Sequence, residues 1–300
     1  MKKYDLLSVG ELLIDILGTD YATSLLDTPN FRRIQGGSPA NLAGNLSKLG
    51  KNVALISCVG NDNLGVYLKN EIEKTGIDTN YIAVSETQPT TIVVVSRTKA
   101  TPDFIAYRTA DRMLLPEHIS DELLADSAIF HTTCFALSQN PAQTTIVDAA
   151  RRAFELGCLV SIDANYAPSI WPNRAEAWQV LNEYCSYGAF VKLSDDDATR
   201  LYGKVIDNEQ IISDFHAKGA SLVCLTLGAE GSIISYENGA KRYQLLGKKI
   251  EVVDATGAGD AFWSGFLCAY LDGKPIPDCA EYGSAIAVLK LTGKAIERFD

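Results

Sequence analysis

The sequence has few residues that bind metals or form cross-links. It contains three histidines, and its seven cysteines are irregularly spaced without any Cys-x-x-Cys pair. Neither a zinc-type ligand cluster nor a disulfide framework is therefore expected. Most of the cysteines lie in apolar runs, where cysteine behaves as a small hydrophobic residue. This usage predicts a reduced, cytoplasmic protein.

Long apolar stretches and basic patches are also absent. No segment approaches the ~18 uncharged apolar residues of a membrane span, and the first residues lack the apolar stretch of a signal peptide. The formal net charge is −10, and no basic stripe offsets it. Nucleic acids, anionic membranes and other polyanionic partners are therefore not expected. A small anion can still bind if backbone amides and a divalent metal hold it locally.

What is present is the material for a large α/β core. Of the 300 residues, 47% are hydrophobic, and short β-branched runs alternate with longer helical patterns, which is typical of a mostly parallel sheet. The expected strands are residues 6–9, 53–59, 128–131, 159–163, 189–193 and 222–226. The expected helices are residues 39–49, 64–75, 141–156, 175–184, 209–218, 258–271 and 280–291.

Two stretches interrupt this alternation. Residues 12–17 with 31–34, and residues 91–96 with 104–107, have the pattern of antiparallel strands joined by polar turns. The turn between the second pair is expected at residues 101–103. Four short strands of this kind indicate a small sheet that is separate from the main one.

This small sheet is expected to form a lid, made of about residues 12–35 and 88–109, on a single domain that spans residues 1–300. Three consecutive valines, Val93 to Val95, are too apolar for a solvated edge strand, so one face of the lid is expected to contact a partner subunit. A symmetric homodimer in which two lids pack face to face is the simplest assembly. The alternative is that these side chains pack onto the main domain of a monomer.

The strongest chemical motif is Val-Val-Asp-Ala-Thr-Gly-Ala-Gly-Asp-Ala-Phe at residues 252–262. An apolar strand runs there into a turn of small residues, Gly257, Ala258 and Gly259, that opens a helix. Free amides and the helix dipole at such a junction attract an anion. Asp260 then lies beside a phosphate site and is expected to be ionised at neutral pH, as a weak base. The alternative is a glycine-rich turn with an acidic residue near the positive helix end.

Other phosphate-binding motifs are missing. A dinucleotide fingerprint needs a third glycine at the position where this chain has Phe262. The sequence has no Gly-x-x-x-x-Gly-Lys-Ser/Thr loop and no His-Arg-Asp set of the protein-kinase type. An oxidoreductase that uses a dinucleotide is therefore a distant alternative, and a P-loop enzyme or a protein kinase is not expected.

Two further motifs suit a ligand with several hydroxyl groups. Gly36 and Gly37 precede a helix that begins near Pro39, and Asn41 offers both a donor and an acceptor to a hydroxyl. Asp15 follows the first strand, where a carboxylate can bind two vicinal hydroxyls. Taken alone, the motifs also fit a capped helix start and a solvated strand end.

Together the three motifs resemble the ribokinase-like, or phosphofructokinase-B-type, sugar kinases over essentially the whole chain. The resemblance implies a three-layer α/β/α domain with a mostly parallel sheet and a small β-sheet lid, ATP as phosphoryl donor, and Mg²⁺ on its phosphates. It also implies that Asp260 is the catalytic base. The amides implied to form the anion hole are those of Gly257, Ala258 and Gly259. The implied sugar contacts are Asp15, Gly36, Gly37, Asn41 and Asp260.

Two more segments agree with the nucleotide side of this family. Ser194 and Asp197 stand where the family usually has Asn-x-x-Glu, so Asp197 is expected to reach the metal through water. Residues 226–231 resemble the turn beside the nucleotide. A solvated helix start and an ordinary β-turn are the alternatives. Ala255 stands where the family more often has Thr, Ser or Pro. This replacement weakens the expectation of a monovalent-cation site nearby, and a monovalent cation is kept only as an optional cofactor. The implied nucleotide contacts are Ser194, Thr226, Gly228, Gly231, Gly257 and Gly259.

The motifs leave the identity of the sugar open. Ribokinases have Asn where this chain has Leu13, which argues against ribose, and the motifs are more similar to those of fructokinases. Fructose is therefore the expected substrate. The alternatives are acid sugars, 2-keto-3-deoxygluconate or 5-dehydro-2-deoxygluconate, with Arg108 as a candidate contact. Ala167, where such kinases usually have Arg, weakens both assignments. A catalytically silent sugar- or nucleotide-binding protein of the same fold is the alternative of another class.

Overall fold

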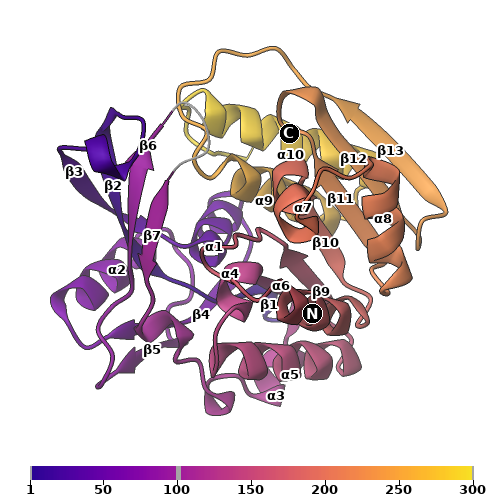
Figure 1. Cartoon of the computed structure of the whole chain (residues 1–300). Coiled ribbons are helices and arrows are strands. Elements are labelled where there is room, and N and C mark those ends of the chain that lie inside the picture. Colours follow the sequence, from indigo (N-terminus) through magenta and orange to yellow (C-terminus); the bar gives the residue numbers. More distant parts are fainter. Residues whose placement is uncertain (1, 99–102, 299–300) are drawn as a thin grey trace.

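The computed structural model describes residues 2–98 and 103–298. A large sheet lies between two layers of helices, and a second, smaller sheet projects from one side of the main body (Figure 1). This is the three-layer arrangement with a lid that the sequence predicts. Two residues of the predicted lid turn, Thr101 and Pro102, lie outside the described residues.

The large sheet has nine strands and is mostly parallel. At one edge, β12 and β13 run antiparallel to their neighbours. Every residue of β4 is buried, as expected for a parallel strand that is covered on both faces. In spatial order the strands are β13 (Lys241–Leu246), β12 (Gly231–Tyr236), β11 (Leu222–Thr226), β10 (Phe190–Ser194), β9 (Leu159–Asp163), β8 (Ser127–Thr133), β1 (Tyr4–Val9), β4 (Val53–Gly60) and β5 (Ile82–Ser85).

Two apolar cores join the sheet to its helical layers. Leu6 of β1 belongs to one core and Leu7 to the other, because successive side chains of a strand point to opposite faces. The helices on the Leu6 side are α1 (Ser38–Lys48), α2 (Asn63–Glu73), α9 (Ala258–Leu271) and α10 (Ile276–Leu291). The helices on the Leu7 side are α3 (Asp121–Ala125), α4 (Cys134–Leu137), α5 (Ala142–Glu155), α6 (Arg174–Cys185), α7 (Asp195–Tyr202) and α8 (Asn208–Ala217).

Helix α9 positions the chemical motif. It is buried without a break from Ala261 to Ala269 and packs between α1 and α10. A helix that is apolar all round is held by the core on every side. Its N-terminus therefore has a fixed place, and the strongest motif of the sequence begins there.

The lid consists of four strands in the order β3-β2-β6-β7. The pairs β2–β3 and β6–β7 are antiparallel, whereas β2 and β6 run parallel, so the sheet is mixed. Strand β6, which carries the three valines, is an interior strand and not an edge strand, and Val93 is buried. The bounds are β2 (Leu13–Tyr21), β3 (Phe31–Gly36), β6 (Ile92–Arg97) and β7 (Phe104–Tyr107).

Several short or half-exposed elements are not predicted from the sequence. Helices α3 and α4 have five and four residues, too few for a helical period to show. Strand β13 is mostly exposed at the sheet edge, and β12 buries the polar side chains of Ser232 and Ser235. Both strands therefore lack the continuous apolar run that marks the central strands.

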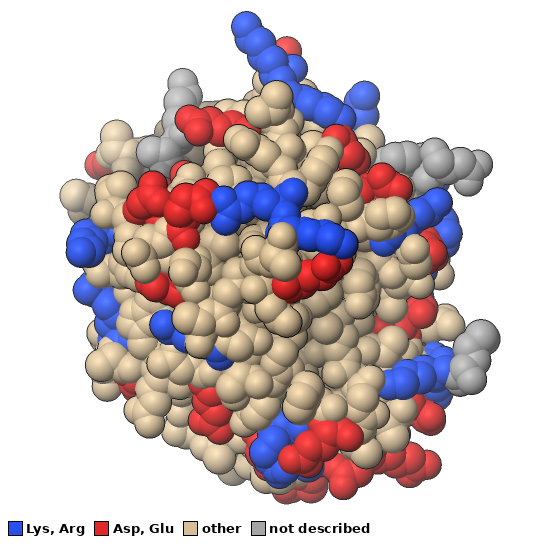
Figure 2. Space-filling view, turned by 90° about the vertical axis from the view of Figure 1, so that its right-hand side faces the viewer, with Lys and Arg blue, Asp and Glu red and all other residues tan. Residues whose placement is uncertain are grey.

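The surface is mixed in charge. On the face shown in Figure 2, the basic and acidic side chains of the described residues are interspersed, and no extended basic surface forms there. Within residues 2–98 and 103–298, no helix combines the length and the apolar character that crossing a membrane requires.

Candidate active site

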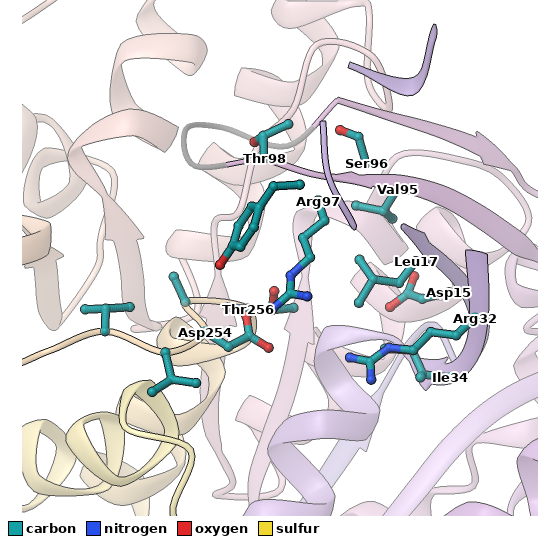
Figure 3. A pocket seen from close by; sticks show the side chains of 14 residues that line it. Asp15, Leu17, Arg32, Ile34, Val95, Ser96, Arg97, Thr98, Asp254 and Thr256 are labelled. Carbon is teal, nitrogen blue, oxygen red and sulfur yellow. Dashed lines mark hydrogen bonds between the residues drawn. The ribbon is translucent and has the colours of Figure 1, made fainter. Parts of the chain in front are cut away.

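A cavity of about 540 Å³ opens between the lid and the segment that leads into α9 (Figure 3). Strands β2, β3 and β6 line one side, and residues 252–256 line the other. Figure 3 shows Asp15, Arg32 and Arg97 entering the cavity from the lid, with Asp254 opposite them. A predicted sugar contact thus lies next to the approach to the predicted phosphate-binding turn.

Asp260 lies in the first turn of α9, where two glycine-rich turns meet. Its Oδ1 accepts a hydrogen bond from the Ser38 hydroxyl at 2.7 Å, and its Oδ2 accepts one from the Asn41 side-chain amide at 3.0 Å. Ser38 and Asn41 both belong to the first turn of α1. The predicted sugar-binding segment therefore orients the predicted catalytic carboxylate.

The surroundings of Asp260 strengthen it as a base. Burial raises its pKa, and hydrogen bonds from Ser38 and Asn41 and the charges of Lys192 and Lys290 oppose this rise without cancelling it. The helix N-terminus alone predicts a low pKa and a weak base, whereas the structure raises the pKa of Asp260. Desolvation outweighs the interactions that favour the charged form. A raised pKa suits a group that removes a proton.

Asp15, on β2, lies against the backbone of Gly36 at the end of β3. A Cβ on Gly36 would stand 2.2 Å from Oδ2 of Asp15, so this conformation of Asp15 requires glycine at position 36. Burial and then the negative charge of Asp260 raise the pKa of Asp15 to about 7. The charges of Asp15 and Asp260 therefore interact within one site.

Glu11 is a buried carboxylate to which the sequence analysis assigns no role. It is 2% exposed and accepts hydrogen bonds from the Ser38 backbone amide at 3.2 Å and from the Thr133 hydroxyl at 3.0 Å. Burial raises its pKa to about 8. Gly37 has a φ of 106°, and a Cβ there would stand 2.3 Å from the Glu11 carbonyl oxygen. Glu11 thus ties the start of α1 to the ends of β1 and β8.

The predicted anion-binding turn forms the start of α9. Gly257 is the N-cap residue, with a left-handed φ of 72° and no side chain to cap the helix. The Ala258 amide donates to the Ala255 carbonyl at 3.2 Å, which closes the turn. Because the helix end is not capped by a side chain, its free amides are available to an external anion.

Lys192 is a buried cation beneath this turn, and the sequence analysis gives it no function. Its side chain comes from β10, and its Nζ lies 2.8 Å from Oδ2 of Asp163 at the end of β9. A Cβ on Gly259 would stand 2.8 Å from the same Nζ. The pKa of Lys192 is raised despite its burial, because the charges of Asp163 and Asp197 favour the protonated form.

Ser194 and Asp197 are placed at the start of α7. The Ser194 hydroxyl and backbone amide both donate to Oδ2 of Asp197, at 2.6 and 3.0 Å, and Arg200 donates to Oδ1 at 3.0 Å. Both oxygens of Asp197 are therefore already engaged by protein groups. This geometry agrees with a contact to a metal through water better than with direct coordination.

The other predicted nucleotide residues lie beside this segment. Thr226 ends β11 and is the register partner of Ser194 on β10. Gly228 begins a short 3-10 turn with a φ of 54°, and Gly231 begins β12. Ser194 and Thr226 thus lie side by side at the carboxyl ends of two neighbouring strands, and Gly228 and Gly231 follow in the next turn.

Two carboxylates, Asp163 and Asp197, are candidates to hold a magnesium ion. Within the described part of the chain, no three His, Cys, Asp or Glu side chains are grouped so that they could hold a metal alone. Magnesium usually keeps several waters and uses one or two carboxylates together with substrate phosphates. Asp163 has a buried Oδ1 without a hydrogen-bond partner, and the charge of Asp197 acts on it. Asp163 and Asp197 therefore fit a hydrated ion.

Arg108, the predicted contact for an acid sugar, is engaged elsewhere. Its Nε donates to Asp111 at 2.9 Å, its Nη1 donates to the Phe135 carbonyl at 2.6 Å, and its side chain is 3% exposed. The cavity is lined instead by Arg32 and Arg97. The sequence alone does not reveal these two, because their direction depends on the register of the lid strands.

Comparisons with known proteins agree with this arrangement. The family described as "pfkB family carbohydrate kinase" matches residues 3–296. The chain is 36% identical over 293 residues to an "ATP-dependent 6-phosphofructokinase" of Thermoanaerobacterium thermosaccharolyticum, which covers 97% of this chain and 88% of that relative. It is 30% identical over 275 residues to "Probable fructokinase-4" of Arabidopsis thaliana, which covers 90% of this chain and 83% of the relative.

Solved structures support the fold over the same length. A fructokinase of Halothermothrix orenii superposes with a TM-score of 0.79 at 35% identity and covers 99% of both chains. An uncharacterized sugar kinase of Pyrococcus horikoshii in complex with ATP superposes with a TM-score of 0.85 at 28% identity and covers 97% of this chain and 93% of that one. These likenesses confirm the predicted ribokinase-like fold.

Proposed function

Because the chain belongs to the pfkB family of carbohydrate kinases, we propose that it transfers the γ-phosphoryl group of ATP to a hydroxyl group of fructose. The observation that carries this proposal is the position of Asp260. It is hydrogen-bonded to the segment that begins α1 and lies one residue beyond the small-residue turn of α9. A proton acceptor between a hydroxyl-binding segment and an anion-binding turn is the arrangement that phosphoryl transfer to an alcohol requires.

The proposed step is an in-line displacement. A sugar hydroxyl oxygen bonds to the γ-phosphorus while the bond from that phosphorus to the β,γ-bridging oxygen breaks, so that ADP leaves. Asp260 accepts the hydroxyl proton, and the turn at residues 257–259 binds the phosphoryl oxygens. Magnesium, when bound to the phosphates, neutralises part of their charge. Asp15 and Asn41 orient the sugar, and Asn41 also orients Asp260.

A coupled assay of ADP release tests the reaction. We expect ADP release that depends on the sugar, with fructose giving a higher kcat/KM than ribose, glucose, 2-keto-3-deoxygluconate or 5-dehydro-2-deoxygluconate. Hydrolysis of ATP without dependence on a sugar, or no turnover, would favour a silent binding protein. An acid sugar preferred by more than ~100-fold would overturn fructose as the substrate.

A second candidate substrate, fructose 6-phosphate, is favoured by one observation. Arg32 and Arg97 both line the cavity on the lid side, and arginine binds phosphate well. A relative with 36% identity is named an ATP-dependent 6-phosphofructokinase. If this chain uses the phosphorylated sugar, Arg32→Ala raises its KM by more than about tenfold and leaves turnover of free fructose unchanged. If fructose is the substrate, Arg32→Ala is expected to have no effect in either assay.

We also propose that the protein is a homodimer through its lid. Val94 shares one face of the lid with Ile105 and Tyr107, which are 49% and 59% exposed. Exposed apolar side chains on one face of a sheet favour a second copy of the chain. Light scattering at micromolar concentration is expected to give a dimer, and Val94→Asp a monomer. A monomeric wild type, or a variant that stays dimeric, contradicts this interface.

A further inference from the structure

A lysine side chain lies against each of the two glycines of the anion-binding turn. A Cβ on Gly259 would stand 2.8 Å from Nζ of Lys192, and a Cβ on Gly257 would stand 3.5 Å from Cε of Lys290. The same point at Gly257 is 3.7 Å from Oδ2 of Asp260. Lys192 comes from β10 and Lys290 from the last turn of α10. Two distant segments thus place cations beside one turn.

The two lysines differ in how their charge is used. Lys192 is 5% exposed and its ammonium is paired with Asp163, so a protein carboxylate already engages it. Lys290 is half-buried, and within the described residues no hydrogen bond or ion pair engages its ammonium. An unpaired ammonium on a flexible stem can meet an anion that arrives from solvent.

The end of α10 is fixed to this site. The backbone amide of Val253 donates to the Leu291 carbonyl at 2.8 Å, which joins the segment before the turn to the residue after Lys290. Hydrogen bonds from Thr256, followed by the charge of Lys290, lower the pKa of Asp254 against the effect of burial. The charge of Lys290 also acts on Asp260. The charge of Lys290 therefore interacts with the carboxylates on both sides of the turn.

The charge of the site explains why such a cation is needed. Five carboxylates surround the turn and the cavity, whereas the nucleotide that the proposed function requires is itself strongly anionic. Lys192 is paired with Asp163, and its charge also acts on Asp197 and Asp260, so one buried cation faces several carboxylates. The carboxylates are Asp15, Asp163, Asp197, Asp254 and Asp260. Arg32 and Arg97 line the lid side of the cavity, so a cation beside the turn itself would lower the Coulomb repulsion that a phosphate meets there.

We propose that Lys290 is a phosphate-binding residue of this kinase and that its ammonium contacts the terminal phosphates of the nucleotide at the Gly257–Gly259 turn. This proposal rests on the proposed function, since it assigns the turn to the nucleotide. Lys192 then acts as a positioning residue that holds Asp163 beneath the turn. The lysine that is free in the structure binds the ligand, and the lysine that is paired supports the fold.

Lys290→Met tests the proposal because it removes the charge and keeps most of the apolar stem. Calorimetric titration is expected to give a dissociation constant for ADP that is about 10–100-fold higher than in the wild type, because a charge-assisted contact is lost. Binding of AMP, which lacks the outer phosphates, is expected to change less than twofold. In turnover, kcat/KM for ATP is expected to fall by a similar factor, with the sugar KM unchanged. Lys290→Arg is expected to restore part of the ADP affinity.

Lys294→Met is the matched control, since Lys294 is exposed and follows α10 by only three residues. It removes the same charge from the surface and is expected to leave ADP binding unchanged. The proposal is overturned if Lys290→Met binds ADP as the wild type does, if ADP and AMP weaken equally, or if the control gives the same loss. A wild type that binds ADP but phosphorylates no sugar contradicts the proposed function instead, and the ADP comparison still decides the role of Lys290.

Discussion

The two glycine-rich turns that meet at Asp260 are built for different reasons. At Gly36 and Gly37 an added Cβ would stand 2.2 Å from the Asp15 carboxylate and 2.3 Å from the Glu11 carbonyl. At Gly257 the nearest atom lies 3.5 Å away, at the end of a flexible lysine side chain. The first turn is closely packed by the protein itself, whereas the second leaves room for a side chain at Gly257, although Lys192 lies against Gly259. We therefore assign the first turn mainly to folding and the second to the proposed ligand.

The largest expected effect comes from the carboxylate between the turns. Asp260→Asn keeps the shape of the side chain and removes the proton acceptor, so kcat is expected to fall by about 10²–10⁴-fold. Both turns stay intact, so the melting temperature and the affinity for ADP are expected to change little. Turnover close to that of the wild type would show that Asp260 is not the base.

Alanine at each turn separates folding from ligand binding. Gly37→Ala places a Cβ against the Glu11 carbonyl at a positive φ, and the free energy of unfolding is expected to fall by about 3 kcal/mol. Gly257→Ala meets only ordinary van der Waals contacts, at 3.5 Å or more, and bears the cost of its φ, about 1 kcal/mol. Urea unfolding gives both values. Equal losses of stability at the two positions would remove the distinction between the turns.

The raised pKa of Asp15 makes the first turn sensitive to pH. In the proposed function its carboxylate binds sugar hydroxyls when ionised, and with a pKa of about 7 its ionised fraction rises about tenfold between pH 6 and pH 8. The sugar dissociation constant, measured by calorimetry, is expected to fall by a similar factor over this range. In Asp15→Asn binding is expected to be weaker and to lose this dependence. A wild-type constant that is independent of pH would contradict the assignment.

The same group has the opposite effect on stability. The folded pKa of Asp15 lies above the unfolded value of about 3.9, so folding favours the protonated form. Its contribution to stability is full below pH 4 and is lost as the pH rises through 7. Asp15→Asn is therefore expected to melt at a higher temperature than the wild type at pH 8, with a smaller difference at pH 5. A variant that is less stable at pH 8 would show that the Asp15 charge is not costly.

The smallest expected effect concerns one hydrogen bond across the two turns. Ser38→Ala removes the donor to Oδ1 of Asp260, and kcat at neutral pH is expected to fall by about two- to tenfold. Because that bond favours the charged form, the pKa on the acidic side of the kcat profile is expected to rise. An unchanged profile would mean that Ser38 does not orient the base.

Local sequence patterns reveal the elements of the fold that are buried on both faces. The apolar run of β4 and the apolar helix α9 are predicted with bounds that differ from the structure by no more than one residue. The pair β12–β13 is not predicted, because β13 is mostly exposed and β12 buries serines against neighbours that are distant in sequence. The motifs also single out Asp260 and Asn41, whose hydrogen bond joins positions 219 residues apart.

The parts of the site that depend on strand register are beyond the reach of such patterns. Arg32 and Arg33 are adjacent in β3, yet Arg32 lines the cavity and Arg33 stacks over the Tyr67 ring at 3.7 Å. Arg108 is a reasonable candidate from the sequence, but Asp111 holds it. Lys192 and Lys290 approach the turn only after two distant segments pack together. In each case the tertiary structure decides which cation reaches the cavity or the turn.

The continuity of β3 with α1 has a consequence for the order of events. Strand β3 ends at Gly36, and α1 begins two residues later with Ser38, so the lid and the helix that holds Asp260 are one uninterrupted piece of chain. A displacement of the lid is transmitted along this piece to the hydrogen bonds on Asp260. We therefore expect Asp260 to be aligned for proton transfer only when a bound sugar fixes the position of the lid. Such coupling would make the sugar the first substrate to bind and ATP the second.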